Sequence, residues 1–145
     1  MTDQSIRSIE LTRTSLGHYE AINPRGGRLS FGSGAGDHFT PVELLLAAIA
    51  GCSAADVDHI TAKRAEPTRF EVQMSGDKVR DDNGNHLVNL SLTFDITFPS
   101  GPEGDAAREA LPRAAAQSHD RLCTVSRTVE LGSPIDVTIE GASKQ

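Results

Sequence analysis

The sequence predicts an α+β fold, because strand patterns and helix patterns follow one another in groups along the chain. Three short strand patterns come first, and one long apolar helix pattern follows them. A hairpin of two long strands is next, before helical segments and a last strand. This order lacks the regular alternation of strand and helix that indicates a parallel sheet. The length of 145 residues fits one core, so we expect a single domain over residues 1–145.

The first three expected strands are short and are separated by turn residues. Arg13 alternates in phase with Ile9 and Leu11, which would direct the arginine toward the core. The stretch NPRGG, which starts at Asn23, supplies the residue types that favour turns. The strands are expected over residues 5–14, 18–22 and 28–31.

The clearest helix pattern covers residues 41–64. Thr40 and Glu43 have the spacing of a capping box, and Pro41 occupies the first helical position. The pattern is almost uncharged as far as Asp56, so the helix should be buried on most sides. Because one antiparallel sheet covers only one side of such a helix, we expect a second copy of the chain to cover the rest.

Residues 70–98 predict a β-hairpin. The stretch FEVQM alternates apolar and polar residues, and DDNGNH supplies a turn around Asn83 and Gly84. The strand over residues 86–98 alternates without a slip, which predicts one wet face.

The C-terminal part of the chain predicts two helical segments and a strand. A helix is expected over residues 105–122, with a kink or restart at Pro112. Cys123 should open one or two further helical turns. Alternating apolar residues between Ile135 and Ile139 predict a last strand, and the tail GASKQ is expected to fray.

Charge and composition exclude several classes of function. The net charge of -6 argues against a nucleic-acid partner. A run of about eighteen apolar residues is missing, as is the pattern of a secretory signal, so we expect a cytoplasmic protein with no membrane partner. The histidines are scattered and predict no metal site.

Two cysteines, Cys52 and Cys123, are the candidate reactive groups. In a reducing compartment both should be free thiols at rest. Cys52 lies too deep in its helix for the helix dipole to favour a thiolate, so it needs a nearby cation or hydrogen-bond donor. Cys123 lies between Arg121 and Arg127 at the start of a helical turn, where an anion is better tolerated. The residues alone leave open whether both thiols are simply core residues.

Other polar residues in these helices are predicted to be structural. His119, Asp120 and Ser126 are the residue types of a hydrolytic triad, but no nucleophile-elbow motif accompanies them. Asp56 lies one turn after Cys52 and would by itself raise the pKa of that thiol. We therefore expect Asp56 to cap or to pair with a basic group.

The stretches TPVELLLAAIAGCSAADV and LCTVSRTVEL together resemble the OsmC/Ohr family of thiol-dependent peroxidases, and more closely a less characterised branch of it. The resemblance covers nearly the whole chain in the order of its elements. Its specific motifs are a helix pattern that contains Glu43 and Cys52, and a C-x-V-S turn that contains Cys123 and Ser126. It implies an intertwined homodimer in which two long central helices pack against antiparallel sheets.

The family resemblance also implies a reaction. Cys52 would be the peroxidatic cysteine and Cys123 the resolving one, in one redox site at a subunit interface. Organic hydroperoxides would be the substrates, with hydrogen peroxide as a further candidate. An external dithiol would restore the thiols, and the better-known branch uses a lipoyl-bearing protein. The chemistry implies no metal, flavin or haem cofactor.

Family members support the reactive cysteine with a glutamate ten residues before it and with an arginine. Here Val42 lies ten residues before Cys52, and Glu43 lies nine residues before it. Nine residues turn a straight helix by about 180° relative to the start, which favours a capping role for Glu43 over a catalytic one. The candidate arginines are Arg13, ranked first, and Arg28.

Two alternatives to a peroxidase stay open at this stage. A protein of the same fold without peroxidase activity would bind a small apolar ligand in the dimer cleft. Two structural cysteines that never meet are the other alternative. A contact between the two sulfurs would argue against the second.

Overall fold

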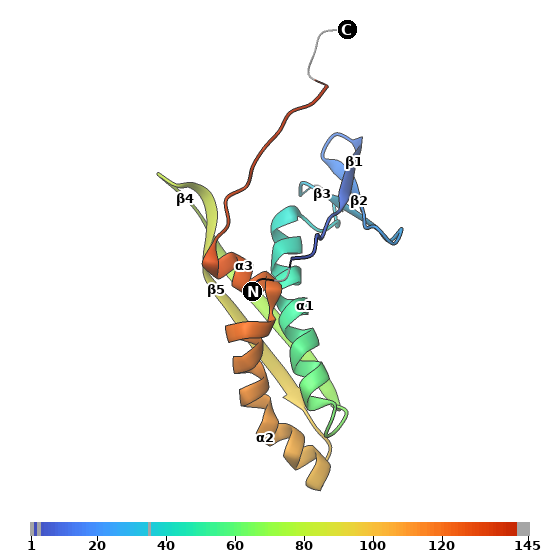
Figure 1. Ribbon diagram of the computed structural model, residues 1–145, viewed down its shortest axis with the longest axis vertical. Coiled ribbons are helices and arrows are strands. Elements are labelled where there is room, and N and C mark those ends of the chain that lie inside the picture. Colours follow the sequence, from blue (N-terminus) through green and yellow to red (C-terminus); the bar gives the residue numbers. More distant parts are fainter. Residues whose placement is uncertain (1, 3, 35, 142–145) are drawn as a thin grey trace. The chain divides into compact units, whose positions relative to one another are not determined.

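The computed structural model describes residues 2, 4–34 and 36–141 (Figure 1). The chain divides into two compact units, residues 1–47 and residues 48–145. The expected frayed tail lies outside the described residues, apart from Gly141.

The first unit contains a three-stranded antiparallel sheet in the order β1-β2-β3. The side-chain Oδ1 of Asn23 accepts the backbone N–H groups of Arg25 and Gly27, both at 2.9 Å, and so organises the loop before the third strand. All three predicted strands are confirmed, although the first begins later than expected. The strands are β1 (Glu10–Ser15), β2 (His18–Ile22) and β3 (Arg28–Gly32).

Helix α1 (Pro41–Thr61) begins in the first unit and continues in the second. The predicted capping box is confirmed: the Thr40 N–H donates to Glu43 Oε1 at 3.0 Å, and the Glu43 N–H donates to Thr40 Oγ1 at 3.2 Å. The helix ends three residues before the predicted Arg64. Its length and hydropathy would suffice to cross a membrane, a test that the core helices of soluble proteins also pass.

The capping box gives a pH-dependent prediction. Hydrogen bonds from the backbone and side chain of Thr40 hold the pKa of Glu43 below its ordinary value of 4.5. Because the folded pKa is depressed, the carboxylate stabilises the helix above the unfolded pKa, and this contribution disappears as the pH falls through the folded pKa. Glu43→Ala should therefore lower the thermal unfolding midpoint at neutral pH and have a progressively smaller effect in acid. An equal loss of thermal stability at neutral and at acidic pH would contradict this role for Glu43. Glu66→Ala, which changes an exposed glutamate, is the control.

The second unit contains the predicted antiparallel hairpin of β4 (Arg69–Asp81) and β5 (Gly84–Thr97). The Asn83 N–H donates to Asp81 Oδ1 at 2.8 Å within the turn. Gly84 follows with a φ of 92°, a left-handed backbone that glycine adopts without steric cost. The turn around Asn83 and Gly84 is therefore confirmed.

The prediction that this strand alternates without a slip is wrong. The pairing register shifts between Ser75 and Asp77, and Asn89 has a φ of 54°. The Asn89 side chain donates to Asp77 Oδ2 at 2.9 Å, which holds the irregular turn of the strand. A Cβ atom at Gly76 would lie 2.7 Å from Leu90 Cδ2, so any larger residue there would require the Leu90 side chain to move. The alternation of residue types gives no sign of the shift, because both sides of it carry apolar residues.

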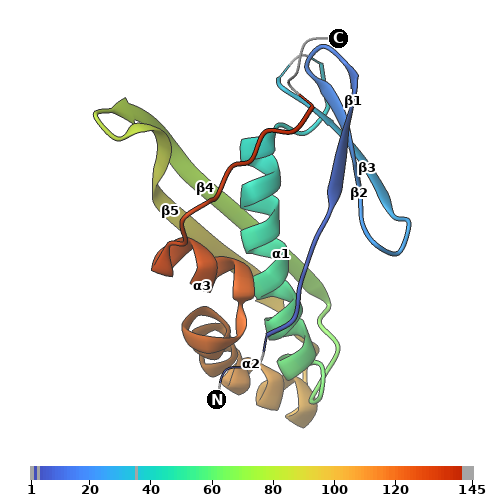
Figure 2. The same ribbon diagram turned by 45° about the horizontal axis from the view of Figure 1, so that its top comes forward.

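The helices of the second unit cover one face of the hairpin. Phe98, directly after β5, packs with Ala65 and with Ala107 of α2 (Pro102–Gln117), and Ile96 of β5 packs against this cluster. Leu92 lies on the same face of β5 as Ile96 and lines a cavity with residues of α1 and α3 (Thr124–Leu131). Figure 2 shows α1 running along the hairpin, with α3 beside it.

The predicted restart at Pro112 is wrong, since α2 continues through this residue. Pro112 is exposed and has no N–H to donate within the helix. Water can instead bind the carbonyl group, one turn earlier, that would accept this hydrogen bond. The irregularity comes later, in a short π-helix, η1 (Ser118–Leu122). It closes with a hydrogen bond from the Cys123 N–H to the Ser118 carbonyl at 2.8 Å.

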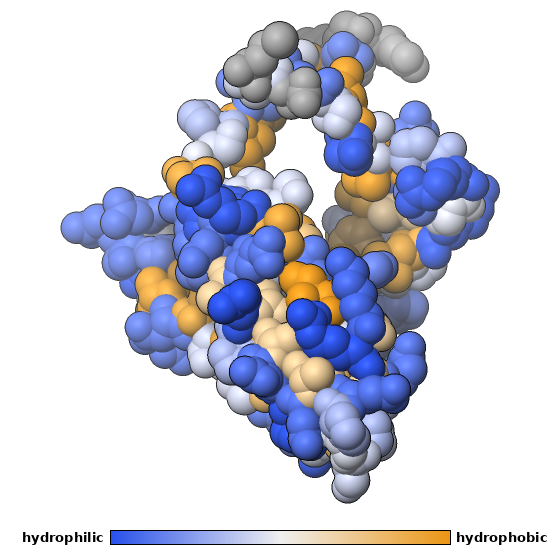
Figure 3. All heavy atoms as spheres, turned by 60° about the horizontal axis from the view of Figure 1, so that its bottom comes forward, coloured by the Kyte–Doolittle hydropathy of each residue, from blue (hydrophilic) through white to orange (hydrophobic). Residues whose placement is uncertain are grey.

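The predicted last strand does not form within the described part of the chain. Residues 132–140 are extended and have no strand partner there. Without a neighbouring strand to pair with their backbone groups, they do not form a strand. Ile135 is 86% exposed and Ile139 is 79% exposed. Apolar side chains open to solvent are also visible in the space-filling view (Figure 3). The alternating pattern thus describes an apolar segment that pairs with no strand among residues 4–34 and 36–141.

Candidate functional site

The two cysteines meet at the N-terminal end of α3. Cys52 lies on α1, and Cys123 is the residue that caps α3. The Cys52 thiol is within hydrogen-bonding reach of the Cys123 sulfur. The backbone N–H of Val125, in the first turn of α3, is close enough to the Cys52 sulfur to lower the pKa of that thiol. Both sulfurs therefore lie beside N–H groups of the first turn of α3, which have no acceptor within the helix itself. Negative charge is favoured at this end of a helix.

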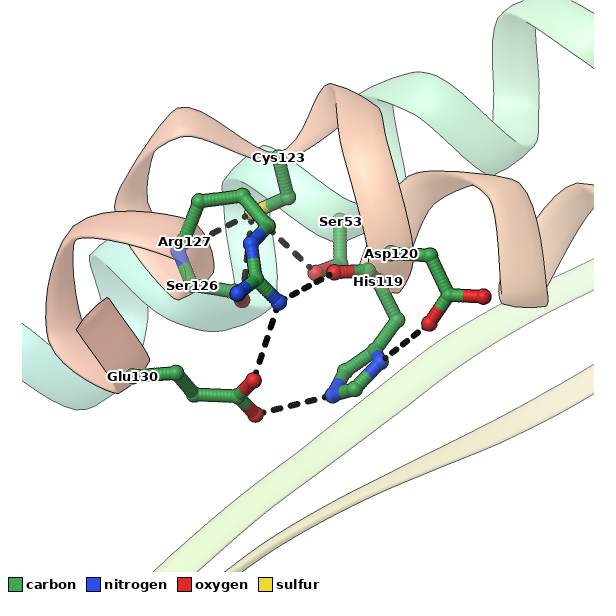
Figure 4. Close-up of polar contacts among 7 residues, drawn as sticks. All are labelled: Ser53, His119, Asp120, Cys123, Ser126, Arg127 and Glu130. Atoms are coloured by element: carbon green, nitrogen blue, oxygen red, sulfur yellow. Dashed lines mark hydrogen bonds and ion pairs between the residues drawn. The ribbon is translucent and has the colours of Figure 1, made fainter.

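Cys123 is fully buried and is surrounded by hydrogen-bond donors (Figure 4). Ser53 Oγ, on α1, donates to the Cys123 sulfur at 3.4 Å. The Ser126 N–H donates to the same sulfur at 3.4 Å. The Ser126 hydroxyl lies 3.2 Å away, where it accepts from the thiol and can donate to a thiolate. The sequence of α3 produces this arrangement, because Cys123 and Ser126 occupy the two positions that interact in an N-terminal cap.

The environment of Cys123 favours its ionised form. Burial is the largest effect and raises the pKa of this thiol. Hydrogen bonds from Ser126, Ser53 and the Cys52 thiol oppose burial and together lower the pKa below the ordinary cysteine value. The result is a buried sulfur that is stabilised as an anion by uncharged donors.

Cys52 has the opposite character. Its side chain is partly exposed, and burial is the largest effect that raises its pKa. Cys123 and the Asp56 carboxylate raise the pKa further, while the Val125 N–H lowers it. The predicted effect of Asp56 on the thiol is confirmed. Among residues 48–141, Asp56 pairs with no basic group; its Oδ2 accepts from Ser118 Oγ at 2.8 Å.

A cluster of charged residues connects η1 to α3 beside the thiols (Figure 4). His119 binds Asp120 Oδ1 at 3.0 Å and Glu130 Oε1 at 2.9 Å, and these contacts raise the pKa of the histidine. Arg127 donates to Glu130 Oε2 at 3.0 Å. Ser126 is engaged with the cysteine sulfur and not with His119, so these residues do not form a hydrolytic triad.

The remaining predicted site residues belong to the first unit. Glu43 accepts the Thr40 N–H and serves as a helix cap. Arg28 forms an ion pair with Glu20 across the sheet. Arg13 lies on β1 opposite Tyr19. Within the part of the chain that the structure describes, no three His, Cys, Asp or Glu side chains are grouped as metal ligands.

Two serines contact the Cys123 sulfur, and the sequence signals one of them better than the other. Ser126 belongs to the C-x-V-S turn and could be singled out from that motif. Ser53 follows Cys52 directly and carries no motif of its own. Its only signal is a polar side chain at a position that proves to be 3% exposed in an apolar helix. A buried hydroxyl in such a place needs a partner, and here the partner is a sulfur from a distant segment.

An apolar cavity of about 240 Å³ lies next to the thiol site, and Ser126 is common to both. Residues from α1, the hairpin, η1 and α3 line it. His119 and Glu130 form its polar edge. The apolar residues that line it are Ile49, Met74, Leu90, Leu92 and Val129.

Comparisons with known proteins agree with this architecture. Uncharacterised proteins of Mycobacterium tuberculosis and Mycobacterium bovis are 29% identical over 129 residues, which cover 88% of this chain and 91% of theirs. A hypothetical protein from Aquifex aeolicus has 21% identity and a TM-score of 0.71, with 90% and 91% of the two chains covered. An organic hydroperoxide resistance protein from Legionella pneumophila has 14% identity and a TM-score of 0.55, with 88% and 91% covered.

A family model supplies the assignment. The model described as OsmC-like protein matches residues 34–140, which include both cysteines and both serines of the thiol site. The antiparallel sheets and three helices are those of the same fold. The chain belongs to the OsmC-like protein family.

Proposed function

We propose that the protein is a thiol-dependent peroxidase that reduces organic hydroperoxides through Cys52 and Cys123. The contact between the two thiols carries the proposal. Cys52 is a partly exposed residue, while Cys123 is buried among donors. The hydroperoxide resistance named for the similar Legionella pneumophila protein supports the same substrate class.

The proposed reaction uses the partly exposed sulfur first. The Cys52 thiolate attacks the distal peroxide oxygen, a sulfur–oxygen bond forms, and the oxygen–oxygen bond breaks. The alkoxide leaves with the electron pair and takes a proton to become an alcohol. The Cys123 thiolate then attacks the sulfenic sulfur of Cys52 and displaces hydroxide, which gives the disulfide. An external dithiol, for which a lipoyl-bearing protein is the proposed source, returns both cysteines to thiols.

A homodimer is the proposed working form, in which the two units of each chain act as one domain. Several apolar side chains of α1 are only partly covered within the chain; Val42 and Leu45 are each 40% exposed. The extended segment from Ile135 to Ile139 is more exposed still. In an intertwined dimer, the partner chain would cover the exposed side of α1 and would supply a strand neighbour for the extended segment. The family fold is a soluble domain, and we propose a cytoplasmic location.

We propose Arg13 as the residue that favours ionisation of Cys52. Arg28 already has an anionic partner in Glu20, which leaves it less suited to this task. Arg13→Ala should slow oxidation of Cys52 by hydroperoxide at neutral pH by about tenfold, the effect of one pKa unit on the thiolate fraction. Arg28→Ala is the matched variant and should react at nearly the wild-type rate.

Rapid mixing with an equimolar alkyl hydroperoxide tests the peroxidase proposal. The reduced protein should form an intrachain disulfide between Cys52 and Cys123, identified by peptide mass spectrometry. Cumene hydroperoxide should oxidise the protein much faster than it oxidises free glutathione. Thiol loss at the rate of an ordinary free cysteine would overturn the proposal.

A ligand-binding protein without peroxidase activity is the second candidate. The apolar cavity beside Ser126 favours it, and it would leave the thiols unreactive toward peroxide. The third possibility, two structural cysteines that never meet, is contradicted by the contact between them.

A further inference from the structure

We propose that Ser53 and Ser126 hold Cys123 as the ionised member of the pair, so that Cys123 closes the disulfide and later leaves when an external thiol attacks Cys52. Ser53 and Ser126 are thus positioning residues that act through the sulfur. This inference rests on the proposed thiol chemistry, and it assigns each sulfur a fixed role in both halves of the cycle.

The number of donors around each sulfur supports this assignment. The Cys123 sulfur accepts from Ser53 Oγ at 3.4 Å and from the Ser126 N–H at 3.4 Å. The Ser126 hydroxyl, 3.2 Å away, accepts from the Cys123 thiol and turns to donate once the sulfur is a thiolate. The Cys52 thiol is a fourth donor. Cys52 itself has the Val125 N–H close by, and it is the sulfur that faces a carboxylate, that of Asp56. In the resting pair, which shares one proton, the proton therefore lies mainly on Cys52 and the charge mainly on Cys123. The peroxide reaction proceeds through the ionised form of Cys52 that is in equilibrium with this resting state.

The charged groups that the second unit places near the pair do not reverse this order. On α1, the carboxylate of Asp56 acts on Cys52 and opposes its ionisation. On α3, Arg127 pairs with Glu130, and His119 of η1 is held between two carboxylates. The groups that stabilise the Cys123 anion are uncharged hydroxyl, amide and thiol donors.

Ionisation of Cys123 speeds the step that closes the disulfide. Lowering the pKa of an attacking thiol by one unit toward ambient pH raises its ionised fraction about tenfold and lowers its intrinsic nucleophilicity only about threefold. The net gain is therefore about threefold in the closing rate at neutral pH. In this step the Cys123–Cys52 bond forms, the sulfur–oxygen bond breaks, and hydroxide leaves and takes a proton from solvent.

The same environment directs the reduction of the disulfide. An incoming thiolate can reach the Cys52 sulfur, which is partly exposed, and cannot reach Cys123, which is fully buried. Attack at Cys52 forms a mixed disulfide there and expels the Cys123 thiolate. A thiol of lower pKa is the better leaving group, so Ser53 and Ser126 stabilise the departing anion. A second thiol of the reductant then releases Cys52 as a thiol and completes the reductant's own disulfide.

An aromatic disulfide reagent that releases a coloured thiolate tests the closing step without peroxide. The first release reports attack by Cys52 on the reagent, and the second reports displacement by Cys123 from the mixed disulfide. Ser126→Ala and Ser53→Ala should each slow the second release about threefold at neutral pH and move its pH profile to higher pH. Ser126→Thr keeps a hydroxyl and should restore the profile, and Ser91→Ala, at an exposed serine of β5, is the control.

Ultraviolet titration of the thiolates identifies which sulfur carries the charge. Reduced wild-type protein and Cys52→Ser should show a thiolate that forms below the ordinary cysteine pKa, and Cys123→Ser should not. Retention of that thiolate in Cys123→Ser, or a second release whose pH profile ignores both serines, would overturn the inference. Because neither measurement uses a peroxide, an absent peroxide reaction would reject the proposed peroxidase function and leave this assignment standing.

Discussion

Replacement of Cys52 by serine is expected to reduce hydroperoxide consumption by about a thousandfold or more, because the hydroxyl of serine is not ionised at neutral pH and is a poor nucleophile toward peroxide. Cys52 is the partly exposed sulfur of the pair, and Cys123 is fully buried. The remaining cysteine in this variant therefore has no route to the substrate. Stopped-flow measurement of peroxide loss, with a dithiol present, gives the rate.

Cys123→Ser is the matched variant and should fail at a later step. Its Cys52 should still consume an equimolar amount of peroxide and accumulate as a sulfenic acid, which dimedone traps for mass spectrometry. Turnover with a dithiol should fall, because disulfide closure is lost. If Cys52→Ser kept the first reaction and Cys123→Ser lost it, the roles assigned to the two cysteines would be reversed.

Gly104→Ala is expected to cause the largest loss of stability, about 3 kcal/mol or more. Gly104 is buried in the first turn of α2. A Cβ atom there would lie 1.7 Å from the carbonyl oxygen of Pro99 and 2.8 Å from its carbonyl carbon. Both of these are backbone atoms, so no side-chain rotation relieves the overlap. The start of the helix must move away from the segment that follows β5.

Urea unfolding of Gly104→Ala measures this cost. Glu103→Ala is the control, since it changes an exposed residue of the same turn and should alter the free energy of unfolding by less than about 0.5 kcal/mol. A change of similar size in both variants would mean that α2 shifts freely. The packing of Ala107 against Phe98 would then contribute less to the core than its burial indicates.

Local signals predicted much of the fold. The Thr40–Glu43 capping box gave the start of α1, and the turn around Asn83 gave the hairpin. The errors came where a neighbour or solvent decides the outcome. Pro112 leaves α2 unbroken because it faces solvent, and the alternating segment from Ile135 has no strand to pair with among the described residues of its own chain.

The candidate site was less accessible to sequence reasoning. Each cysteine could be found in its own segment, but the contact between them depends on how α3 packs on α1. Ser53 became a donor to Cys123 only through that packing, across 70 positions of sequence. A motif can mark Ser126 because its partner is three residues away, whereas local spacing contains no information about a partner so distant.

The π-helix before Cys123 acts as a spacer of one residue. Its closing bond spans five residues, from Cys123 back to Ser118, and Ser118 is itself fixed to α1 through Asp56. Removal of one residue from this segment would allow an ordinary α-helical turn, yet it would rotate everything that follows by about 100° around the helix axis. Chain length in this segment is therefore under a stricter constraint than residue identity. A relative that is one residue shorter here could keep a stable helix while its second cysteine no longer faces the first.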